Sequence, residues 1–322
     1  MKLSGAHWRW ARRGLTLAFF ILVPTLLFLL LRNQDWGEVR QALVAYPRER
    51  LLLGGVIAAC SFVLFSCYDL LGRRYTGHTL PTRKVVPLAF VCYAFNLNLS
   101  AWVGGVALRY RLYSRLGLDV PTISRVLGLG LVTNWLGYLL VAGSLFACGL
   151  PRLPAGLEIG SSGLRVIGVL MLLAGAAYLC ACAFAQRRSW QIRGQAIKLP
   201  GIRLALLQAL MGACNWMLMG LVIYTLLPEK VGYPSILGIL MISSIAGVIT
   251  HIPAGLGVLE AVFITLLQGQ YAQGTLLAAL IAYRVLYFLL PLLVACIVYL
   301  VLERVASQGA PASSPGPRGS SH

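Results

Sequence analysis

Five charged side chains of this 322-residue sequence lie within or beside long apolar stretches, and they are the groups best placed to do chemistry. Arg284 lies deep in the apolar run Leu276–Leu302, and Glu260 lies deep in the run Ile252–Leu267. A charge at the centre of a membrane helix costs roughly 2.5 to 3.5 kcal/mol, so such groups are expected to face a partner or a watery cavity. Arg284 and Glu260 therefore form either a buried ion pair that stabilises the fold or a polar cavity that contacts substrate.

Asp69 is the third of these charges and lies near the end of the apolar run Leu51–Leu71. Arg73 and Arg74 follow within two helical turns. One interpretation is an interfacial salt bridge to these arginines, and the other is a role in the same cavity.

Arg109 and Arg111 complete the set and follow the glycine pair Gly104-Gly105. Residues two apart on a helix diverge by about 200°, so the two side chains cannot point the same way. We expect one to face the cavity and the other to reach lipid headgroups. The alternative is that both are ordinary basic loop charges on the cytoplasmic side.

The segment Pro253–Gly257 combines proline and glycine between two apolar runs. Gly255 and Gly257 allow close backbone approach and a new helix start, where free N–H groups and the helix dipole favour an anion. Glycine-rich helix packing is the other interpretation of this segment. A second irregular segment, Asn96–Ser100, interrupts the apolar run Val85–Val106. There Asn96 and Asn98 are expected to hydrogen-bond the backbone groups that a break in the helix leaves without partners.

Signals for soluble-type catalysis are absent from the sequence. The four histidines are scattered, no HExxH, Walker or GxSxG motif occurs, and the nine acidic residues do not suggest a carboxylate-rich metal site. All eight cysteines lie in apolar runs without a CxxC spacing. We therefore expect no enzyme activity, no metal and no cofactor.

Composition defines the elements that must position these residues. Hydrophobic residues make up 59% of the chain and charged residues only 11%, whereas soluble domains carry about 25% charged residues. In lipid every backbone polar group must be satisfied internally, and the apolar runs are far longer than barrel strands. The sequence predicts an all-α polytopic membrane protein. Its net charge of +18 lies in short loops, which indicates contact with lipid headgroups and not with nucleic acid.

About eight hydrophobic segments can be drawn. They are Leu15–Leu31, Leu51–Leu71, Val85–Val106, Val126–Leu150, Val166–Ala185, Leu204–Leu227, the pair Ser235–Ile249 with Ile252–Leu267, and Leu276–Leu302. We predict one transmembrane domain over residues 1–306 and a disordered Ser/Pro/Gly-rich tail over 307–322.

Loop charge favours a particular topology. Simple alternation from a cytoplasmic N-terminus places the basic loops Arg109–Arg125 and Arg187–Arg203 outside, against the positive-inside rule. If Val85–Val106 is a re-entrant hairpin, both loops become cytoplasmic. The same reasoning makes Ser235–Leu267 a second hairpin. The chain then has six spanning helices and two hairpins in an inverted repeat, as many transporters do. Eight spanning helices are the alternative, and both topologies place the two termini in the cytoplasm.

Four motifs in order resemble a known family: Tyr68–Leu71, Gly104–Tyr113, Ile252–Glu260 and Tyr283–Pro291. Over roughly residues 10 to 303, the chain is similar to the lysylphosphatidylglycerol synthase transmembrane, or flippase-like, family. That family includes the membrane-flipping part of the multiple peptide resistance factor and short bacterial inner-membrane relatives.

This resemblance implies a lipid-translocating domain whose cavity charges fall on Asp69, Arg109, Arg111, Glu260 and Arg284. The full-length resistance factor continues into a soluble aminoacyl-transfer domain, whereas this sequence ends in the tail. Synthase activity and lysylphosphatidylglycerol as substrate are therefore not expected.

The function expected from the sequence is a flippase or transporter of a phospholipid, with an anionic one preferred, in the bacterial inner membrane. Asp69, Arg109, Arg111, Glu260, Arg284, Gly255 and Gly257 are its expected substrate-binding residues. One alternative is a non-transporting scaffold that partners a phospholipid-synthesising enzyme, and another is a secondary transporter of a small polar metabolite. The expected partners are membrane phospholipids, such an enzyme, or a second copy of the chain, but not nucleic acid.

Overall fold

The structure is a computed structural model that describes residues 37, 41, 44, 46–99, 105–151, 161–185, 189–192, 195–228, 230–250, 252 and 255–308. The expected first helix Leu15–Leu31 and residues 309–322 of the expected tail lie outside this set.

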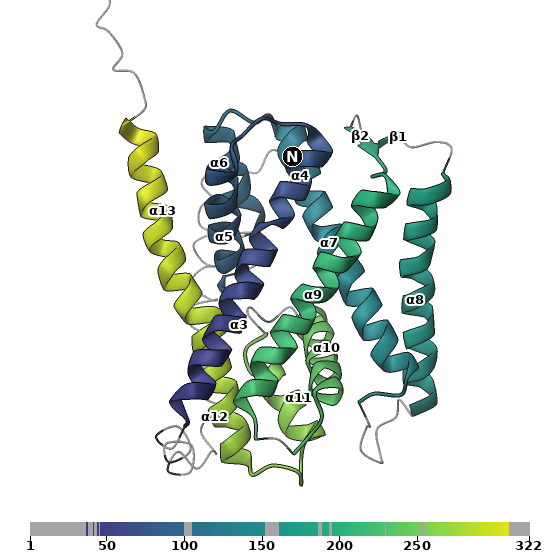
Figure 1. The fold of residues 1–322 in the computed structure, drawn as a ribbon, viewed down its shortest axis with the longest axis vertical. Coiled ribbons are helices and arrows are strands. Elements are labelled where there is room, and N and C mark those ends of the chain that lie inside the picture. Colours follow the sequence, from purple (N-terminus) through teal and green to yellow (C-terminus); the bar gives the residue numbers. More distant parts are fainter. Residues whose placement is uncertain are drawn as a thin grey trace, which may run out of the picture.

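Helices dominate the described chain, as expected from its long apolar runs (Figure 1). In chain order the elements are α3 (Arg48–Ser66), α4 (Tyr68–Thr76), α5 (Thr82–Asn98), α6 (Leu108–Arg115), α7 (Val120–Ala147), α8 (Ser161–Phe184), β1 (Ser189–Ile192), β2 (Gln195–Lys198), α9 (Ile202–Leu226), α10 (Tyr233–Thr250), α11 (Val258–Leu266), α12 (Gln273–Arg284), the π-helix η3 (Val285–Leu289) and α13 (Leu290–Gln308). The two strands pair antiparallel as a short hairpin in the loop between α8 and α9.

Six helical stretches in the described part of the chain are long and apolar enough to cross a membrane. They are Arg48–Thr76, Val120–Ala147, Ser162–Phe184, Ile202–Leu226, Tyr233–Thr250 and Gln273–Leu302. This confirms the prediction of an all-α polytopic membrane protein. Tyr233–Thr250, which the loop charges place in a hairpin, has 18 residues and is the shortest of the six.

Close glycine contacts hold α7, α8 and α9 together. A Cβ on Gly137 of α7 would lie 2.1 Å from the carbonyl carbon of Gly212 in α9, and one on Gly168 of α8 would lie 2.3 Å from the Ala147 nitrogen. Membrane helices lack a hydrophobic drive to associate, and small residues let their backbones pack closely instead. The outer faces remain apolar, with Leu170 and Leu173 of α8 and Leu293 and Ile297 of α13 strongly exposed, as contact with lipid requires.

Two pairs of shorter helices lie between the long ones. α5 and α6 lie in the upper half of Figure 1, and α10 and α11 lie in the lower half. A Cβ on Gly105 would lie 2.6 Å from Asn96 Oδ1, so the chain that returns toward α6 packs on the end of α5. In the second pair, a Cβ on Gly247 would lie 3.7 Å from the Gly255 Cα atom, which places the end of α10 against the chain that leads into α11.

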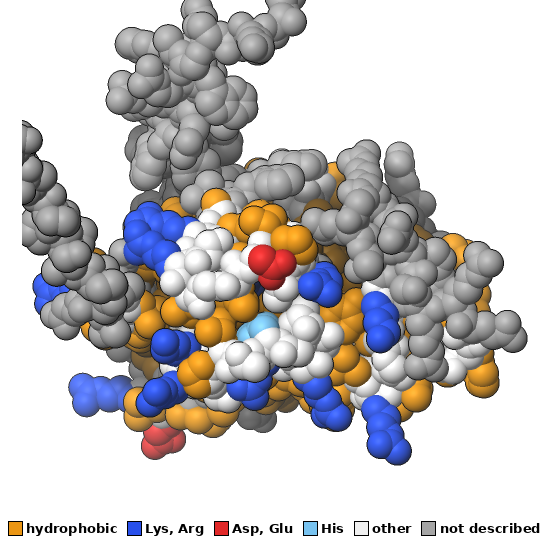
Figure 2. Space-filling model, turned by 90° about the horizontal axis from the view of Figure 1, so that it is seen from above, with side chains coloured by type: hydrophobic (Ala, Val, Ile, Leu, Met, Phe, Trp, Pro, Cys, Tyr) orange, Lys and Arg blue, Asp and Glu red, His pale blue; other side chains and the backbone are white. Residues whose placement is uncertain are grey.

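Basic side chains gather at the upper end of the molecule. Figure 2 shows Lys and Arg side chains distributed over this end. The helix and strand ends that meet there carry Arg73, Arg74, Arg83, Lys84, Arg115, Arg125, Lys198 and Arg203.

Candidate functional site

Glu260 and Arg284 form an ion pair between α11 and the end of α12. Arg284 donates from Nη2 to Glu260 Oε2 at 3.0 Å, and its Nε donates to Oε1. The guanidinium also lies 5.4 Å from the centre of the Phe288 ring. Both side chains are largely buried, with 14% and 11% of the arginine and glutamate side chains exposed. The pairing considered from the sequence is therefore present.

The glycine segment before α11 forms backbone hydrogen bonds with both side chains of this pair. Gly255 (φ +56°) and Gly257 (φ +80°) adopt left-handed backbone conformations that glycine tolerates best. The Gly257 N–H donates to Glu260 Oε2 at 2.9 Å, and the Gly255 carbonyl accepts from Arg284 Nη2 at 3.1 Å. The helix N-terminus thus binds a carboxylate, as its dipole favours. That carboxylate belongs to the protein itself.

Asp69 and Arg109 form a second ion pair, nearer the basic end. Arg109 Nη2 lies 3.0 Å from Asp69 Oδ1, and the Tyr113 hydroxyl donates to Oδ2 at 2.7 Å. Asp69 is only 1% exposed. The buried Nε of Arg109 has no hydrogen-bond partner among the described residues.

One interpretation of the sequence was a salt bridge from Asp69 to the arginines that follow it in the chain. Arg73 does not pair with Asp69; its Nη1 donates to the Leu80 carbonyl and the Thr82 hydroxyl instead. Arg111 is exposed while Arg109 is buried. Their 200° divergence thus places one arginine inside the protein and the other outside.

A cavity of about 270 Å³ lies beside the Glu260–Arg284 pair. The end of α5 contributes Asn96 and Leu97, and the end of α10 contributes Gly247 and Val248. Arg284 lines the cavity together with other polar and aromatic groups, which are Ser243, Ser244, Trp216, Tyr283 and Phe288. We call it the central cavity. The ends of α5 and α10 therefore meet at one cavity, whose mostly apolar lining includes the Arg284 cation.

A buried polar cluster close to this region was not predicted from the sequence. Ser61 Oγ lies 2.8 Å from Asn215 Oδ1 and 2.6 Å from the Tyr287 hydroxyl, which lies 3.1 Å from the Tyr93 hydroxyl. The cluster joins α3, α5, α9 and the π-helix that follows Arg284. An asparagine and a serine inside apolar runs are the signal that indicates such a cluster, because a membrane interior requires partners for both.

Comparison with known proteins identifies relatives over most of the chain. The model of the lysylphosphatidylglycerol synthase TM region family matches residues 15–295. The inner membrane protein YbhN of Escherichia coli is 49% identical over 309 residues, which cover 96% of this chain and 97% of YbhN. The slr0712 protein of Synechocystis sp. is 30% identical over 274 residues, which cover 81% of this chain and 82% of that protein.

The family match spans the four motifs that suggested the resemblance, and it includes all seven expected site residues. The chain belongs to the lysylphosphatidylglycerol synthase transmembrane-region family.

Proposed function

We propose that the protein moves phospholipids between the two leaflets of the membrane, as a transporter without catalytic chemistry. The observation that carries this proposal is a buried ion pair whose arginine, Arg284, lines the central cavity where the ends of α5 and α10 meet, with Glu260 behind it.

The free-energy cost of burying the Glu260–Arg284 pair supports a function beyond stability. Replacing a buried ion pair by apolar residues of similar volume is often neutral or stabilising. The chain has two such pairs, Asp69–Arg109 between α4 and α6 and Glu260–Arg284 between α11 and α12. Polar groups of this kind within a membrane generally mark a substrate or ion pathway.

The geometry suggests how a headgroup is recognised. Arg284 has a planar set of donors suited to a phosphate, and a phosphate that enters the central cavity competes with Glu260 for them. Glu260 keeps the Gly257 N–H as a partner when Arg284 turns away, and it is free to accept a headgroup amine or a coupling proton. Exchange of one partner for another avoids leaving either charge buried and unpaired.

The arrangement of the helix pairs supports alternating access. In our proposal α5–α6 is a re-entrant hairpin from the basic end and α10–α11 is one from the opposite end, so that the two halves of the chain form an inverted repeat. The proposal places the basic end and both termini in the cytoplasm, by the positive-inside rule. It places the protein in the inner membrane, where the name of YbhN locates that relative.

Leaflet exchange in liposomes tests the proposal. Glu260→Gln removes one charge with little change in volume, and Arg284→Gln removes the opposite charge with a shorter polar side chain. Arg165→Gln makes the same change at an exposed arginine of α8 and is the matched control. We expect the first two variants to lose at least about tenfold in exchange rate, since a hydrogen bond to a charged group is worth about 1.5–3 kcal/mol, while the control retains its rate. Unchanged exchange in both neutral variants would rule out transport through this pair.

A further inference from the structure

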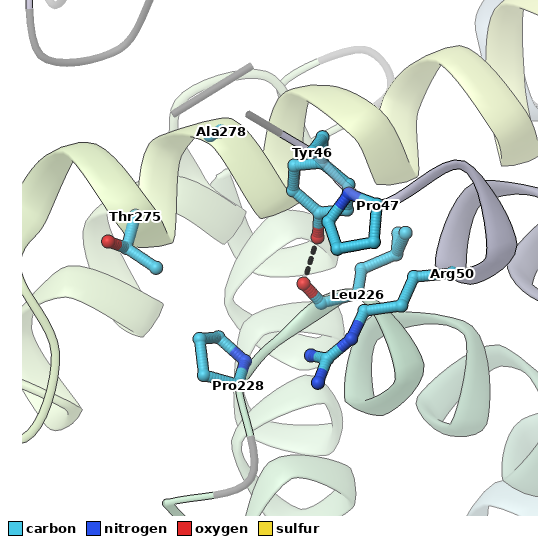
Figure 3. A pocket seen from close by; sticks show the side chains of 7 residues that line it. All are labelled: Tyr46, Pro47, Arg50, Leu226, Pro228, Thr275 and Ala278. Atoms are coloured by element: carbon cyan, nitrogen blue, oxygen red, sulfur yellow. Dashed lines mark hydrogen bonds between the residues drawn. The ribbon is translucent and has the colours of Figure 1, made fainter. Parts of the chain in front are cut away.

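A second cavity lies at the end of the molecule opposite the basic end. It has a volume of about 330 Å³ and is lined by Tyr46, Pro47, Arg50, Leu226, Pro228, Thr275 and Ala278. Figure 3 shows Thr275 across this space from Arg50. We call it the Arg50 crevice.

Arg50 has more donors than its contacts with the described residues use. Its Nη1 donates to the Leu227 carbonyl at 2.8 Å, and a guanidinium carries five N–H donors. The Tyr46 hydroxyl already donates to the neighbouring Leu226 carbonyl, so the end of α9 has a second capping group. Within the described ranges no carboxylate forms an ion pair with Arg50. The crevice therefore presents a half-buried cation to a ligand.

The depth of the crevice corresponds to the headgroup layer of a membrane. Arg50 is the third residue of the span Arg48–Thr76, and Thr275 is the third residue of the span Gln273–Leu302. At ~1.5 Å per residue both lie within one turn of the membrane end of their helices. Two independent helices thus place their polar side chains at the same level.

The surroundings suit a lipid better than a soluble ligand. Leu53 follows Arg50 by three residues, so both lie on one face of α3, and Leu53 is 52% exposed, with Val56 one turn further at 60%. The crevice volume is at the low end of the ~300–1,000 Å³ of ligand clefts, enough for a headgroup but not for its acyl chains. The chains would lie along the exposed apolar face of α3.

We infer that the Arg50 crevice binds the phosphate group of a phospholipid headgroup in the leaflet opposite the basic end. Arg50 donates to the phosphate oxygens, Thr275 offers a hydroxyl, and the exposed face of α3 contacts the acyl chains. This inference deepens the proposed function by adding a docking site for that leaflet. The role of the site in transport rests on the proposed function, whereas binding at the site can be measured without transport.

Binding to the purified full-length protein in detergent tests the site. The probes are short-chain phosphatidylglycerol, diacylglycerol with the same chains but no phosphate, and inorganic phosphate as a competitor. We expect Arg50→Gln to weaken phosphatidylglycerol binding about tenfold, from the loss of a charge-assisted hydrogen bond. Arg48→Gln is the matched control, because Arg48 is an exposed arginine two residues earlier on the same helix. Diacylglycerol should bind equally weakly to all forms.

A second variant distinguishes a loss of binding from a loss of folding. Thr275→Phe fills the crevice from the opposite wall and leaves the bond from Arg50 to Leu227 in place, so it should weaken binding while the unfolding temperature stays near that of the wild type. Competition by inorganic phosphate would identify a site for phosphate itself, and its absence would identify a site that requires the lipid. Equal phosphatidylglycerol affinity in wild type, Arg50→Gln and Thr275→Phe would overturn the inference. If the wild type binds phosphatidylglycerol in the Arg50 crevice but does not speed its leaflet exchange in liposomes, the result would count against the proposed function and not against this site.

Discussion

At the scale of single residues, the two ion pairs have different surroundings. Glu260 and Arg284 lie beside the central cavity and share backbone partners at Gly255 and Gly257. Asp69 is almost fully buried, and Tyr113 satisfies its second oxygen. The first pair is thus placed to open toward a ligand, whereas the second is enclosed by the protein.

The enclosed pair gives a stability prediction. Asp69→Asn leaves the Arg109 cation buried without a counter-charge, and we expect it to lower the free energy of unfolding by about 3–5 kcal/mol. The double variant Asp69→Leu with Arg109→Met should recover most of this loss, because no charge then remains buried. Unfolding in detergent micelles measures both effects.

Arg111→Gln is the control for this series, since Arg111 is exposed and surface substitutions usually stay within about 0.5 kcal/mol. A single Asp69→Asn variant as stable as the wild type would show that Arg109 is not held by this pair.

His78 gives a prediction about pH. It lies in the loop between α4 and α5 with both ring nitrogens buried and unpartnered among the described residues. Burial, with Arg73 nearby, lowers the pKa of His78, although Asp69 opposes this. The unfolded chain then binds a proton that the folded chain does not, so stability is full above the ordinary histidine pKa of about 6.5 and falls as the pH drops below it.

Unfolding temperatures measured from pH 8 to pH 5 check this sign. His78→Gln should show a shallower fall than the wild type, since the variant lacks this one titrating group. Identical curves for the two proteins would mean that His78 does not contribute.

At this scale the sequence indicated the pairing of Glu260 with Arg284 that the structure contains, while the binding role of these residues stays a prediction. A charge within an apolar run is costly enough to stand out by itself, so the apolar pattern alone indicates Glu260 and Arg284 as possible partners. The partner of Asp69 could not be chosen, because Arg73 is near in sequence and Arg109 is near only after folding. The Ser61–Asn215–Tyr287 cluster depends on three helices that meet, and sequence spacing does not reveal such a meeting.

At the scale of elements, the closest helix contacts depend on glycine, which has no side chain to separate the two backbones. In α7, a Cβ on Gly137 would lie 2.1 Å from a backbone atom of α9, whereas a Cβ on Gly130 would meet nothing within 4 Å. The same helix therefore offers a test position and a matched control.

Gly137→Ala should separate α7 from α9 and destabilise the protein by about 1–3 kcal/mol, as overpacking does. Gly130→Ala should be neutral or stabilising by up to about 1 kcal/mol, because alanine favours helix. Thermal unfolding of the two purified variants distinguishes these effects. Equal stability of both variants would contradict the close approach at Gly137.

The helices themselves follow from the length of the apolar runs, and most expected segments agree with the observed ones within a few residues. The sequence does not reveal the π-helix Val285–Leu289, because the residues that follow it are almost all apolar and the shift in phase from one extra residue in a turn leaves no visible trace. Nor did it indicate the β1–β2 hairpin, whose strands are four residues each and carry no long alternation.

At the scale of the whole molecule, the distribution of charge predicts the topology. Six spanning helices with two hairpins place Arg74 and Arg115 on one side of the membrane and Arg165 on the other. Eight spanning helices place Arg74 and Arg115 on opposite sides. A protein whose eight native cysteines are replaced allows each position to be tested as a single cysteine.

We expect a membrane-impermeant thiol reagent to label Arg74→Cys and Arg115→Cys from the same side, and Arg165→Cys from the other. Opposite labelling of positions 74 and 115 would contradict the hairpin at α5–α6 and favour eight spans.

In our proposal, lipids change leaflet through the central cavity, and one measurement tests this most directly. Exchange of labelled phosphatidylglycerol, cardiolipin and phosphatidylethanolamine should be measured in liposomes with wild-type protein, with Arg284→Ala and without protein. We predict faster exchange of at least one lipid with the wild type, and a return to the protein-free rate with Arg284→Ala. Exchange no faster than in protein-free liposomes for every lipid, or exchange that Arg284→Ala leaves unchanged, would contradict the proposal.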